Sequence, residues 1–473
     1  MKNPIELTLF ELVEEIKSGN LDKDEVFFAY KKQINDYDEV YRAYISLCEK
    51  PEKINEGLLT GAPIAIKDNI CTRGIKTTCA SKILGNYKPP YNATVVEKIK
   101  DAGGYVIGKA NMDEFAMGSS TENSAFFPSR NPWDRECVPG GSSGGSAVAV
   151  AAREAAAALG SDTGGSVRCP ASFCGLVGLK TTYGLISRYG LVAFANSLEQ
   201  IGPLTRDVRD CALLLNVISG HDENDGTSLF ANRENYLSYI GREVRGMKLG
   251  IPREFMGEGT DENVKKAVWN CVNLLEGFGA TWKEVDLPSV KYALPAYYMI
   301  AMSEASSNLA RYDGIRYGFR HEDEGQDWSS SYSKTRGEGF GKEVKRRIIL
   351  GTFALSSGYY EAYYLKALKV RTLIRNDFNR LFKEYDVLLG PTMPTPAFKI
   401  GEKVDDPLAM YATDIDTVSI NLSGMPALSI PCGYSHGLPL GLQIMAPALG
   451  EGRIFSVASK LEEELRLSLR PPL

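Results

Sequence analysis

The stretch 139–168 constrains the fold of this chain more than any other. Two loops rich in glycine and serine, PGGSSGGS at 139–146 and GSDTGGSVR at 160–168, flank the alanine-rich run AVAVAAREAAAA. Glycine lets the backbone approach a ligand closely and adopt positive φ, and alanine favours a slim helix. The sequence therefore predicts one small-residue helix between two loops that present backbone N–H groups and hydroxyls to a single point.

Such an arrangement suits acyl transfer, which needs a nucleophilic oxygen and donors aimed at a developing oxyanion. Gly/Ser runs are usually flexible linkers, but Asp162, Arg168 and the helical insert argue against a linker here. Neither loop ends in Gly-Lys-Ser/Thr, as a phosphate-binding loop would. Residues 140–144 match GxSxG, the nucleophile elbow of α/β-hydrolases. The preceding NPWDRECVP, with its two prolines, is a poor candidate for the strand that an elbow requires.

A serine nucleophile needs a base, and the chain has few histidines. His221, His321 and His436 lie in the polar contexts GHDEND, RHEDE and YSHGLP, which are typical of loops and surfaces. Lys67 is the better candidate, because the apolar run PIAI before it predicts a buried strand and burial lowers the pKa of a lysine. Taken alone, this stretch favours a lysine that ends a strand and points to solvent. Asp68, the next residue on the strand, should face away from it.

Taken together, these motifs resemble the amidase signature family. The resemblance rests on IAIKDN at 64–69, GGSSGGS at 140–146, GSDTGGSVR at 160–168 and PASFCGLVGLK at 170–180. It implies an α/β/α fold in which helices cover both faces of a mixed, largely parallel sheet. It also implies a catalytic set of Lys67, Ser142 and Ser166, with Ser166 as nucleophile and Ser142 on a cis peptide bond.

The same resemblance assigns a role to the turn that holds the nucleophile. The N–H groups of that turn would form the oxyanion hole, and its residues are Thr163, Gly164, Gly165 and Ser166. Asp162 and Arg168 bracket the turn and are expected to hold it in shape.

Four further segments resemble the glutaminase subunits of tRNA-dependent amidotransferases within this family. They are MDEFAMGSSTENSAF at 112–126, SSNLARYDGIRYG at 306–318, GFGKEVKRRIILGTFALSSGYYEAYY at 339–364 and DDPLAMYATDI at 405–415. The resemblance places Arg347 on the α-carboxylate of glutamine and Asp414 on its α-ammonium, with Ser119 and Tyr298 lining the pocket. Two alternatives stay open for the first position: Arg346 could take the place of Arg347, and Arg347 could form a surface ion pair.

The resemblance also implies partners. Ammonia from glutamine would pass to a synthetase-like amidotransferase subunit, which uses ATP and magnesium to convert Glu-tRNA(Gln) to Gln-tRNA(Gln), while a second, small subunit completes a heterotrimer. Whether the complex also converts Asp-tRNA(Asn) to Asn-tRNA(Asn) is left open. This chain would hold no metal or cofactor. Its formal charge of −5 and its lack of a GxxxxGK[ST] motif fit a chain that leaves tRNA and ATP to the partner.

Two other function classes are alternatives to this hypothesis. One is a free-standing amidase that acts on another amide and needs neither Arg347 nor Asp414. The other is a non-catalytic scaffold, against which the intact Lys67, Ser142 and Ser166 argue.

The composition favours a cytoplasmic chain without a membrane segment. The 9 cysteines are scattered without paired CxxC spacing, as in a reducing compartment. The start, MKNPIELTLFELVEEIKSG, has no apolar core of a signal peptide. The most apolar stretch, 147–159, is too short to cross a membrane and contains Arg153 and Glu154.

The hydrophobic pattern predicts a single domain over 1–473, with N-terminal helices in 1–55 and a helical insertion across about 289–385. Helices are expected at 8–19, from about 22, and at 92–102, 113–117, 261–278, 358–383 and 453–465. Strands are expected at 63–67, 105–109, 248–252, 280–288, 386–389, 427–432 and 440–445, and a mobile surface loop at 318–342.

Overall fold

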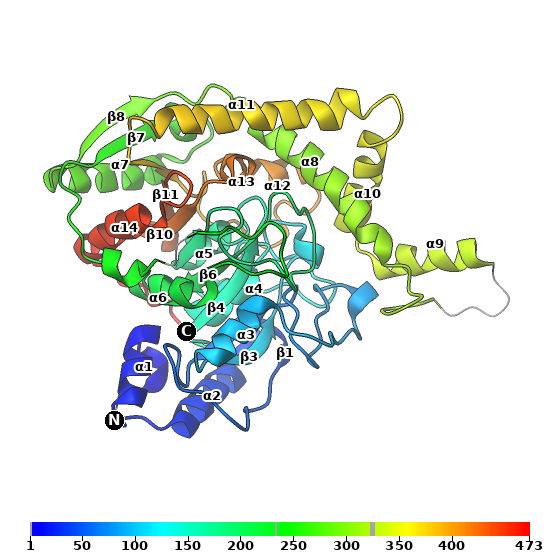
Figure 1. Cartoon of the computed structure of the whole chain (residues 1–473), viewed down its shortest axis with the longest axis horizontal. Coiled ribbons are helices and arrows are strands. Elements are labelled where there is room, and N and C mark those ends of the chain that lie inside the picture. The colour runs from blue at the N-terminus through cyan, green and yellow to red at the C-terminus, as the bar shows by residue number, and fades with distance from the viewer. Residues whose placement is uncertain (1, 232–233, 322–326) are drawn as a thin grey trace.

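One mixed sheet organises the molecule (Figure 1). The computed structural model describes residues 2–231, 234–321 and 327–473, and within them 11 strands pair in the order β1-β3-β2-β4-β6-β5-β10-β11-β9-β7-β8. The strands are β1 Tyr44–Leu47, β2 Pro63–Lys67, β3 Tyr105–Ala110, β4 Ala157–Asp162, β5 Val177–Lys180, β6 Gln200–Thr205, β7 Lys248–Pro252, β8 Thr281–Val285, β9 Val387–Pro391, β10 Ala427–Ser435 and β11 Leu438–Met445.

Helices cover the sheet, as the predicted α/β/α class requires (Figure 1). They are α1 Leu9–Lys17, α2 Lys23–Tyr41, α3 Thr94–Asp101, α4 Gly144–Ala151, α5 Arg168–Cys174, α6 Val208–Ile218, α7 Glu262–Gly277, α8 Ala293–Asn308, α9 Trp328–Gly339, α10 Lys342–Ala354, α11 Lys366–Leu381, α12 Pro407–Ala412, α13 Val418–Ser423 and α14 Glu451–Leu465. Helices α4 and α5 pack together on the sheet, and α6, α7 and α14 form a second group against it.

The sheet is mixed as predicted, but it is not largely parallel. Strands β3, β2 and β4 run parallel at one flank and β9, β7 and β8 at the other, while every pairing between β4 and β9 is antiparallel. Parallel neighbours need a helical crossover, which α3 supplies between β2 and β3 and α7 between β7 and β8. A tight hairpin joins β10 to β11, so these two strands must be antiparallel.

The predicted helix between the two loops is present as α4, but it is shorter than the alanine-rich run. Helix α4 ends at Ala151, Arg153 turns the chain with φ +60°, and the last alanines enter β4, which starts at Ala157. Alanine has the highest helix propensity, but β4 is buried between β2 and β6 and pairs with both. Tertiary pairing has overridden propensity, and the new strand carries the chain directly into the second loop.

The N-terminal helices are close to the prediction. Thr8 Oγ1 accepts from the Glu11 amide (3.2 Å) and Glu11 Oε2 from the Thr8 amide (3.0 Å), so α1 has the expected capping box. Asp22 caps α2. The region 1–55 is not wholly helical, because residues 44–47 form β1 at the edge of the sheet.

The chain between β8 and β9 is helical, as predicted for 289–385. It holds α8, α9, α10, a π-helical turn at Glu361–Leu365 and α11, which crosses the top of the molecule in Figure 1. The predicted loop 318–342 instead contains α9, whose polar sequence has no apolar period; residues 322–326 lie outside the described residues. The expected helix at 113–117 is only a 3₁₀ turn, Glu114–Ala116. That the chain is a single domain stays a prediction.

Two further features concern the lengths of the helices and the state of the cysteines. None of the helices in the described ranges is both long and apolar enough to cross a membrane. All of the cysteines are buried with free thiols.

Candidate active site

Lys67 ends β2 in the core of the molecule. Its side chain is fully buried, and Nζ lies 2.7 Å from Ser142 Oγ, 2.8 Å from Ser143 Oγ and 3.2 Å from the Ser161 carbonyl oxygen. The apolar run before it is buried throughout, so the strand delivers the amine to this point. The alternative of a solvent-facing lysine is therefore wrong.

The surroundings of Lys67 favour its neutral form. Burial lowers the pKa of Lys67 to about 7, against the opposing effect of Asp113 and Asp162. Asp68 faces elsewhere, as expected: its carboxylate accepts from the Thr78 amide at 2.9 Å. A neutral amine keeps two N–H donors and gains a lone pair, so one of the neighbouring serine hydroxyls can donate to Lys67.

Ser142 lies on a cis peptide bond, Gly141–Ser142, as the family resemblance implies. Gly140 has φ +80°, and a Cβ at Gly141 would lie 2.2 Å from Asp113 Oδ2. Glycine is therefore required at each position, by the backbone angle at Gly140 and by the lack of space for a side chain at Gly141. The nucleophile-elbow interpretation of 140–144 is wrong, because within the described ranges the residues just before it form a single bridge, Cys137 with Lys399, and no strand.

Ser166 lies in the turn between β4 and α5, beside the Ser142 loop. The Ser143 amide donates to the Ser166 carbonyl oxygen at 3.1 Å and ties the two loops together. The Ser166 side chain is 8% exposed, and its Oγ has no hydrogen-bond partner in the part of the chain that the structure describes. The hydroxyl is therefore free to meet a substrate.

Asp162 and Arg168 hold the turn in shape, as predicted. The Asp162 carboxylate accepts from the amides of Gly165 (2.8 Å) and Val167 (3.1 Å) and from the Arg168 guanidinium (3.0 Å). The buried guanidinium also donates to Asn421 Oδ1 (2.6 Å). The turn is thus tied to α13 through Arg168.

These bonds correct the predicted oxyanion hole. The Gly165 amide is committed to Asp162, so it is not a free donor. The remaining amides of the turn, those of Thr163, Gly164 and Ser166, donate to no protein atom among the described residues. They stay the predicted donors, and Gly165 serves the turn through its φ of +133°.

Helix α8 closes over this turn. A Cβ at Gly164 would lie 2.4 Å from Tyr297 Cζ, and one at Gly165 would lie 2.4 Å from Thr417 Oγ1. Thr417 Oγ1 donates to the Gly164 carbonyl oxygen at 2.6 Å. The two glycines therefore let Tyr297 and Thr417 pack directly against the backbone.

The residues predicted to bind glutamine come together around Asp414. Ser119 Oγ lies 2.8 and 2.9 Å from its two carboxylate oxygens, and Tyr298 donates to it at 2.8 Å. Burial raises the pKa of Asp414 to about 6, while the hydrogen bonds from Ser119 and Tyr298 oppose that rise. The carboxylate is mostly ionised at neutral pH and suits an ammonium group.

Arg347 faces the same cluster from α10. It is 3% exposed, and its guanidinium carbon lies 5.3 Å from the centre of the Tyr298 ring and 5.4 Å from that of Tyr411. Nε donates to Glu343 Oε1 at 2.7 Å, whereas the terminal NH₂ groups have no acceptor in the described ranges. They are free for a bidentate contact with a carboxylate.

The two arginines differ in burial. Arg346 is exposed and pairs with Glu343 on the outer side, so the interior guanidinium belongs to Arg347. Because Arg347 is buried, it forms no surface ion pair. Sequence reasoning missed Glu343 and Tyr411, which hold Arg347, and Ser143, which holds Lys67. Glu343 could have been found from its i,i+4 spacing to Arg347.

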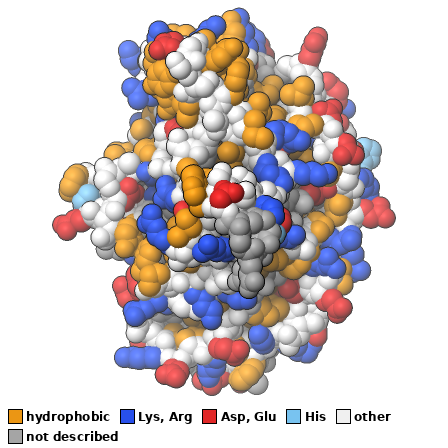
Figure 2. Space-filling view, turned by 90° about the vertical axis from the view of Figure 1, so that its right-hand side faces the viewer, with side chains coloured by type: hydrophobic (Ala, Val, Ile, Leu, Met, Phe, Trp, Pro, Cys, Tyr) orange, Lys and Arg blue, Asp and Glu red, His pale blue; other side chains and the backbone are white. Residues whose placement is uncertain are grey.

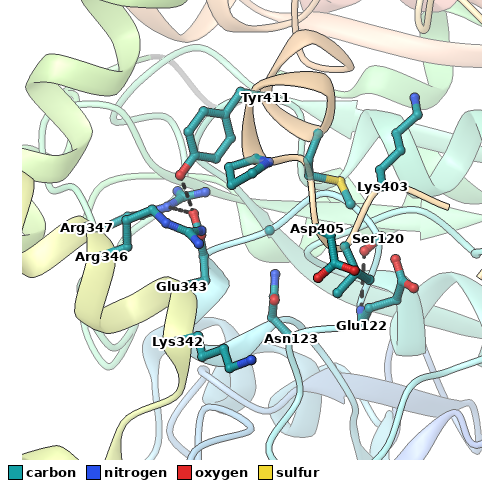
Figure 3. A pocket seen from close by; sticks show the side chains of 14 residues that line it. Ser120, Glu122, Asn123, Lys342, Glu343, Arg346, Arg347, Lys403, Asp405 and Tyr411 are labelled. Carbon is teal, nitrogen blue, oxygen red and sulfur yellow. Dashed lines mark hydrogen bonds and ion pairs between the residues drawn. The ribbon is translucent and has the colours of Figure 1, made fainter. Parts of the chain in front are cut away.

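A cavity of about 190 Å³ leads to the Arg347 end of the site (Figure 3). Figure 3 shows Arg346, Arg347 and Tyr411 on one side and Lys403, Asp405 and Glu122 on the other. The lining residues are Gly118, Ser120, Glu122, Asn123, Lys342, Glu343, Arg346, Arg347, Lys403, Val404, Asp405, Pro407, Met410 and Tyr411. Charges of both signs line the entrance, which suits a zwitterion.

Known proteins are similar to this chain over most of its length. Residues 29–455 match the family model Amidase. The chain belongs to the amidase family. It is 57% identical over 473 residues, and over 99% of each chain, to the A subunit of the glutamyl-tRNA(Gln) amidotransferase of Halothermothrix orenii.

Solved structures also have folds similar to that of this chain. The A subunit of the glutamyl-tRNA(Gln) amidotransferase of Thermotoga maritima superposes with a TM-score of 0.85 at 48% identity, covering 98% of this chain and 96% of that one. The 6-aminohexanoate cyclic dimer hydrolase complexed with substrate matches with a TM-score of 0.85 at 26% identity over 99% of each chain. The predicted family and α/β fold are therefore confirmed.

Proposed function

We propose that this chain is the glutaminase subunit of an amidotransferase that converts Glu-tRNA(Gln) to Gln-tRNA(Gln). The observation that carries the proposal is the pairing, in one cluster, of a buried guanidinium with free donors, Arg347, and a buried carboxylate, Asp414. Free glutamine carries the complementary α-carboxylate and α-ammonium, whereas a simple amide carries neither. The names of the full-length relatives support the same function.

Catalysis begins when Ser166 Oγ attacks the carboxamide carbon of the glutamine side chain. A serine hydroxyl is a weak nucleophile unless its proton is removed as it attacks. Ser142 takes that proton and passes its own to neutral Lys67, whose Nζ lies 2.7 Å away. The free amides of Thr163, Gly164 and Ser166 stabilise the resulting oxyanion.

The tetrahedral intermediate then collapses. The proton stored on Lys67 returns through Ser142 to the departing nitrogen, and ammonia leaves. The Ser166 γ-glutamyl ester remains. Water attacks the ester carbon by the same relay, the Ser166 oxygen leaves and regains its proton, and glutamate is released.

The product explains why partners are needed. Ammonia in water at neutral pH is mostly protonated and non-nucleophilic, so it has to travel inside protein to an activated Glu-tRNA. The synthetase-like subunit would use ATP and magnesium to activate the tRNA-bound glutamate, and the small subunit would complete the heterotrimer. The net negative charge of this chain fits an assembly in which tRNA binds mainly to the partner.

Ser166→Ala tests the nucleophile. It should abolish glutamine hydrolysis, with a loss of at least about 1000-fold, and it should prevent covalent labelling by an amide-directed inhibitor. Ser142→Ala should also be nearly inactive but should keep the labelling site at Ser166. If labelling maps to Ser142 in the wild-type chain, the assignment of Ser166 is wrong.

Arg347→Ala tests the substrate. It should raise KM for glutamine by about 30- to 100-fold, the loss expected for a charge-assisted bidentate contact. The hydrolysis of butyramide, which lacks both α-groups, should change little. Lys342→Ala, at an exposed cation of the same cavity, is the matched control. Equal losses on both amides would favour a free-standing amidase.

An isotope experiment tests the partnership. The isolated chain should hydrolyse glutamine slowly, and the rate should rise when the synthetase-like and small subunits, ATP, magnesium and Glu-tRNA(Gln) are added. With amide-¹⁵N glutamine in a pool of unlabelled ammonium, the label should be retained in Gln-tRNA(Gln). Dilution of the label to the bulk ratio would show release and recapture of ammonia.

A further inference from the structure

Asp113 is a buried carboxylate that the proposed mechanism does not use. On the face shown in Figure 2, basic and acidic side chains intermix, and water screens their charges. Asp113 is instead 0% exposed and lies against the loop that carries Ser142. A Cβ at Gly141 would lie 2.2 Å from Asp113 Oδ2, and a Cβ at Gly118 would lie 2.4 Å from Oδ1. Glycine at both positions therefore lets the backbone close around the carboxylate.

The Asp113 carboxylate organises the segment 118–123. Its Oδ2 accepts from the Thr121 amide at 2.8 Å and its Oδ1 from the Asn123 amide at 3.1 Å. Within the described residues these two amides are its only hydrogen-bond donors, so no lysine or arginine side chain bonds to it. The carboxylate therefore keeps its charge available to groups farther away. We call the pair Asp113 and Thr121 the Asp113 brace.

Thr121 connects the Asp113 brace to the loop on both sides of Ser142. Its hydroxyl donates to the Gly140 carbonyl oxygen at 2.8 Å and accepts from the Gly144 amide at 3.1 Å. The Asp113 amide donates to the Ser142 carbonyl oxygen at 3.2 Å. Thr121 has φ +66°, which is unfavourable for a β-branched residue, so these contacts outweigh a local cost. Three hydrogen bonds thus fix the backbone that presents the Ser142 hydroxyl to the proton relay.

The same segment reaches the predicted ammonium site. Ser119 Oγ lies 2.8 and 2.9 Å from the two carboxylate oxygens of Asp414. Figure 3 shows Glu122 and Asn123 of the segment on the wall of the cavity. A shift of the Asp113 brace would therefore move both the relay and the site for the α-ammonium group.

Asp113 also acts on the charge of Lys67. Among the groups around Lys67, Asp113 opposes most strongly the lowering of the Lys67 pKa by burial. The other titratable groups that raise this pKa are Asp162, Cys79 and Glu199. Asp162 is already paired with the Arg168 guanidinium at 3.0 Å. Because a negative charge near a buried amine favours the ammonium form, Asp113 can stabilise the charge that Lys67 acquires when it accepts the proton from Ser142.

Asp113 carries its own charge at neutral pH. Burial raises the pKa of Asp113 to about 6. The amides of Asn123 and Thr121 and the charge of Lys67 oppose that rise, whereas Glu122 adds to it. The carboxylate is therefore mostly ionised above pH 7, in the range where neutral Lys67 is available. The two states that the relay needs, a neutral amine and an ionised carboxylate, coexist there.

We propose that the Asp113 brace is a positioning device for the hydrolysis of glutamine: it holds the Ser142 loop against Lys67, and its carboxylate stabilises the protonated lysine. Asp113 acts through Lys67 and Ser142 and is a positioning residue, not a member of the relay. Because the braced segment carries Ser119, the brace also aligns the ammonium site with the relay. The proposal rests on the proposed function, whose relay the brace serves.

Asp113→Asn tests the charge. Asparagine keeps the shape of the side chain but loses the negative charge, so protonated Lys67 becomes less stable. At pH 8, kcat for glutamine should fall about 10- to 100-fold, and the acidic limb of the kcat profile should move about 1 pH unit to lower pH. Initial rates from pH 5 to 9 on the full chain measure both, and circular dichroism checks that the variant folds. A loss of kcat without movement of the limb would show a purely structural role and overturn the role of the charge.

Thr121→Ala tests the geometry without touching the charge. Alanine removes the hydroxyl that bonds to Gly140 and Gly144 and tolerates the positive φ at least as well as threonine. Because the Ser142 loop is released, kcat should fall about 10- to 100-fold, while the acidic limb should stay at its wild-type pH. Thr205→Ala is the matched control: this buried hydroxyl donates to the Asp207 carbonyl oxygen at 2.8 Å, and its variant should keep the wild-type kcat. Wild-type kcat in Thr121→Ala would overturn the positioning role, whatever the outcome for Asp113→Asn.

A comparison of two amides tests the alignment with the ammonium site. Asp113→Asn should reduce kcat/KM for both glutamine and butyramide, and the loss for glutamine should be larger by about three- to tenfold, because Ser119 is released as well. Equal losses would overturn the link to the ammonium site. If the wild-type chain hydrolyses butyramide but not glutamine, the proposed function is wrong, whereas a shifted acidic limb with butyramide would still support the Asp113 brace.

Discussion

Two lysines at equivalent places in the sheet share a low pKa but not a chemistry. Lys67 is the last residue of β2 and Lys180 the last residue of β5, and both side chains are fully buried. Burial lowers the pKa of each to about 7. A search for perturbed lysines alone would rank them together.

Lys67 and Lys180 differ in their hydrogen-bond partners. Lys67 Nζ faces the hydroxyls of Ser142 and Ser143, which can both give and accept a proton. Lys180 Nζ donates to the carbonyl oxygens of Thr181 (3.0 Å) and Met425 (2.5 Å), which have no proton to exchange. A low pKa therefore identifies a base only where a proton partner lies beside it, and Lys180 joins two segments of backbone.

Matched substitutions should give the largest difference between the two sites. Lys67→Met should reduce kcat for glutamine hydrolysis by at least about 1000-fold, since it removes the proton acceptor of the relay. Lys180→Met should leave kcat per folded molecule within about tenfold of the wild type. Steady-state kinetics measures both, on protein quantified by absorbance and with the folded fraction taken from circular dichroism.

Lys67→Arg sharpens the same comparison. Arginine keeps the positive charge and the N–H donors but cannot be deprotonated in this range, so the variant should be nearly as inactive as Lys67→Met. Substantial activity in Lys67→Arg would mean that Lys67 acts as a charge and not as a base.

The two serines that contact Lys67 should differ by a smaller factor. Ser142→Ala breaks the relay and should cost about 100- to 10,000-fold in kcat, the usual range for a proton-transfer group. Ser143 Oγ also bonds to the Ser161 carbonyl oxygen at 3.2 Å, so it positions Lys67. Ser143→Ala should cost about tenfold, on the scale of one hydrogen bond. Equal losses would place both serines in the relay.

The short motifs around Lys67, Ser142 and Ser166 supported the family resemblance, and the resemblance then assigned the catalytic set. The run PIAI predicted that Lys67 ends a buried strand, but on this stretch alone a side chain pointing to solvent was the favoured interpretation. The mapping of Arg347 and Asp414 came from resemblance, since nothing local in VKRRI or YATDI shows that α10 turns Arg347 inward. The packing of α10 on α8 decides that, and packing is a long-range property.

In two places the prediction and the structure differ because a local sequence signal favoured a different structure. The alanines at 155–158 favour a helix by propensity, yet pairing with β2 and β6 makes the last of them a strand. Gly165 looked like one more donor in a glycine-rich turn, but its amide is taken by Asp162 three residues before it. The sequence alone shows neither which strands pair with β4 nor which way the Asp162 side chain points, so neither outcome could be predicted from it.

The pH dependence of catalysis should follow Lys67 and not Lys180. Because the pKa of Lys67 is about 7, kcat should fall about tenfold per pH unit below pH 6 and level off above pH 8. Lys180→Met should leave this profile where it is. A profile that moves with Lys180→Met would show that the two lysines are coupled. Initial rates from pH 5 to 9 provide the measurement.

The smallest effect should appear in the stability of the fold, where the two lysines should act alike. An unfolded lysine holds its proton up to about pH 10.5, whereas folded Lys180 loses it near pH 7. Between these values the unfolded state binds one more proton, so the free energy of unfolding rises with pH by about 1.4 kcal/mol per pH unit for each such lysine. Below pH 7 both states are protonated and this contribution no longer changes.

Lys180→Met should therefore remove about 1.4 kcal/mol per pH unit from that slope, and Lys67→Met should remove the same amount. Urea titrations from pH 8 to 9.5 suit the measurement, because the raised pKa of Glu462, about 8, gives an opposite slope at lower pH. That contribution is common to the wild type and the variants and cancels in the difference. If Lys180→Met leaves the slope unchanged, Lys180 is charged in the folded protein. The statement that Lys67 and Lys180 share a low pKa would then be wrong.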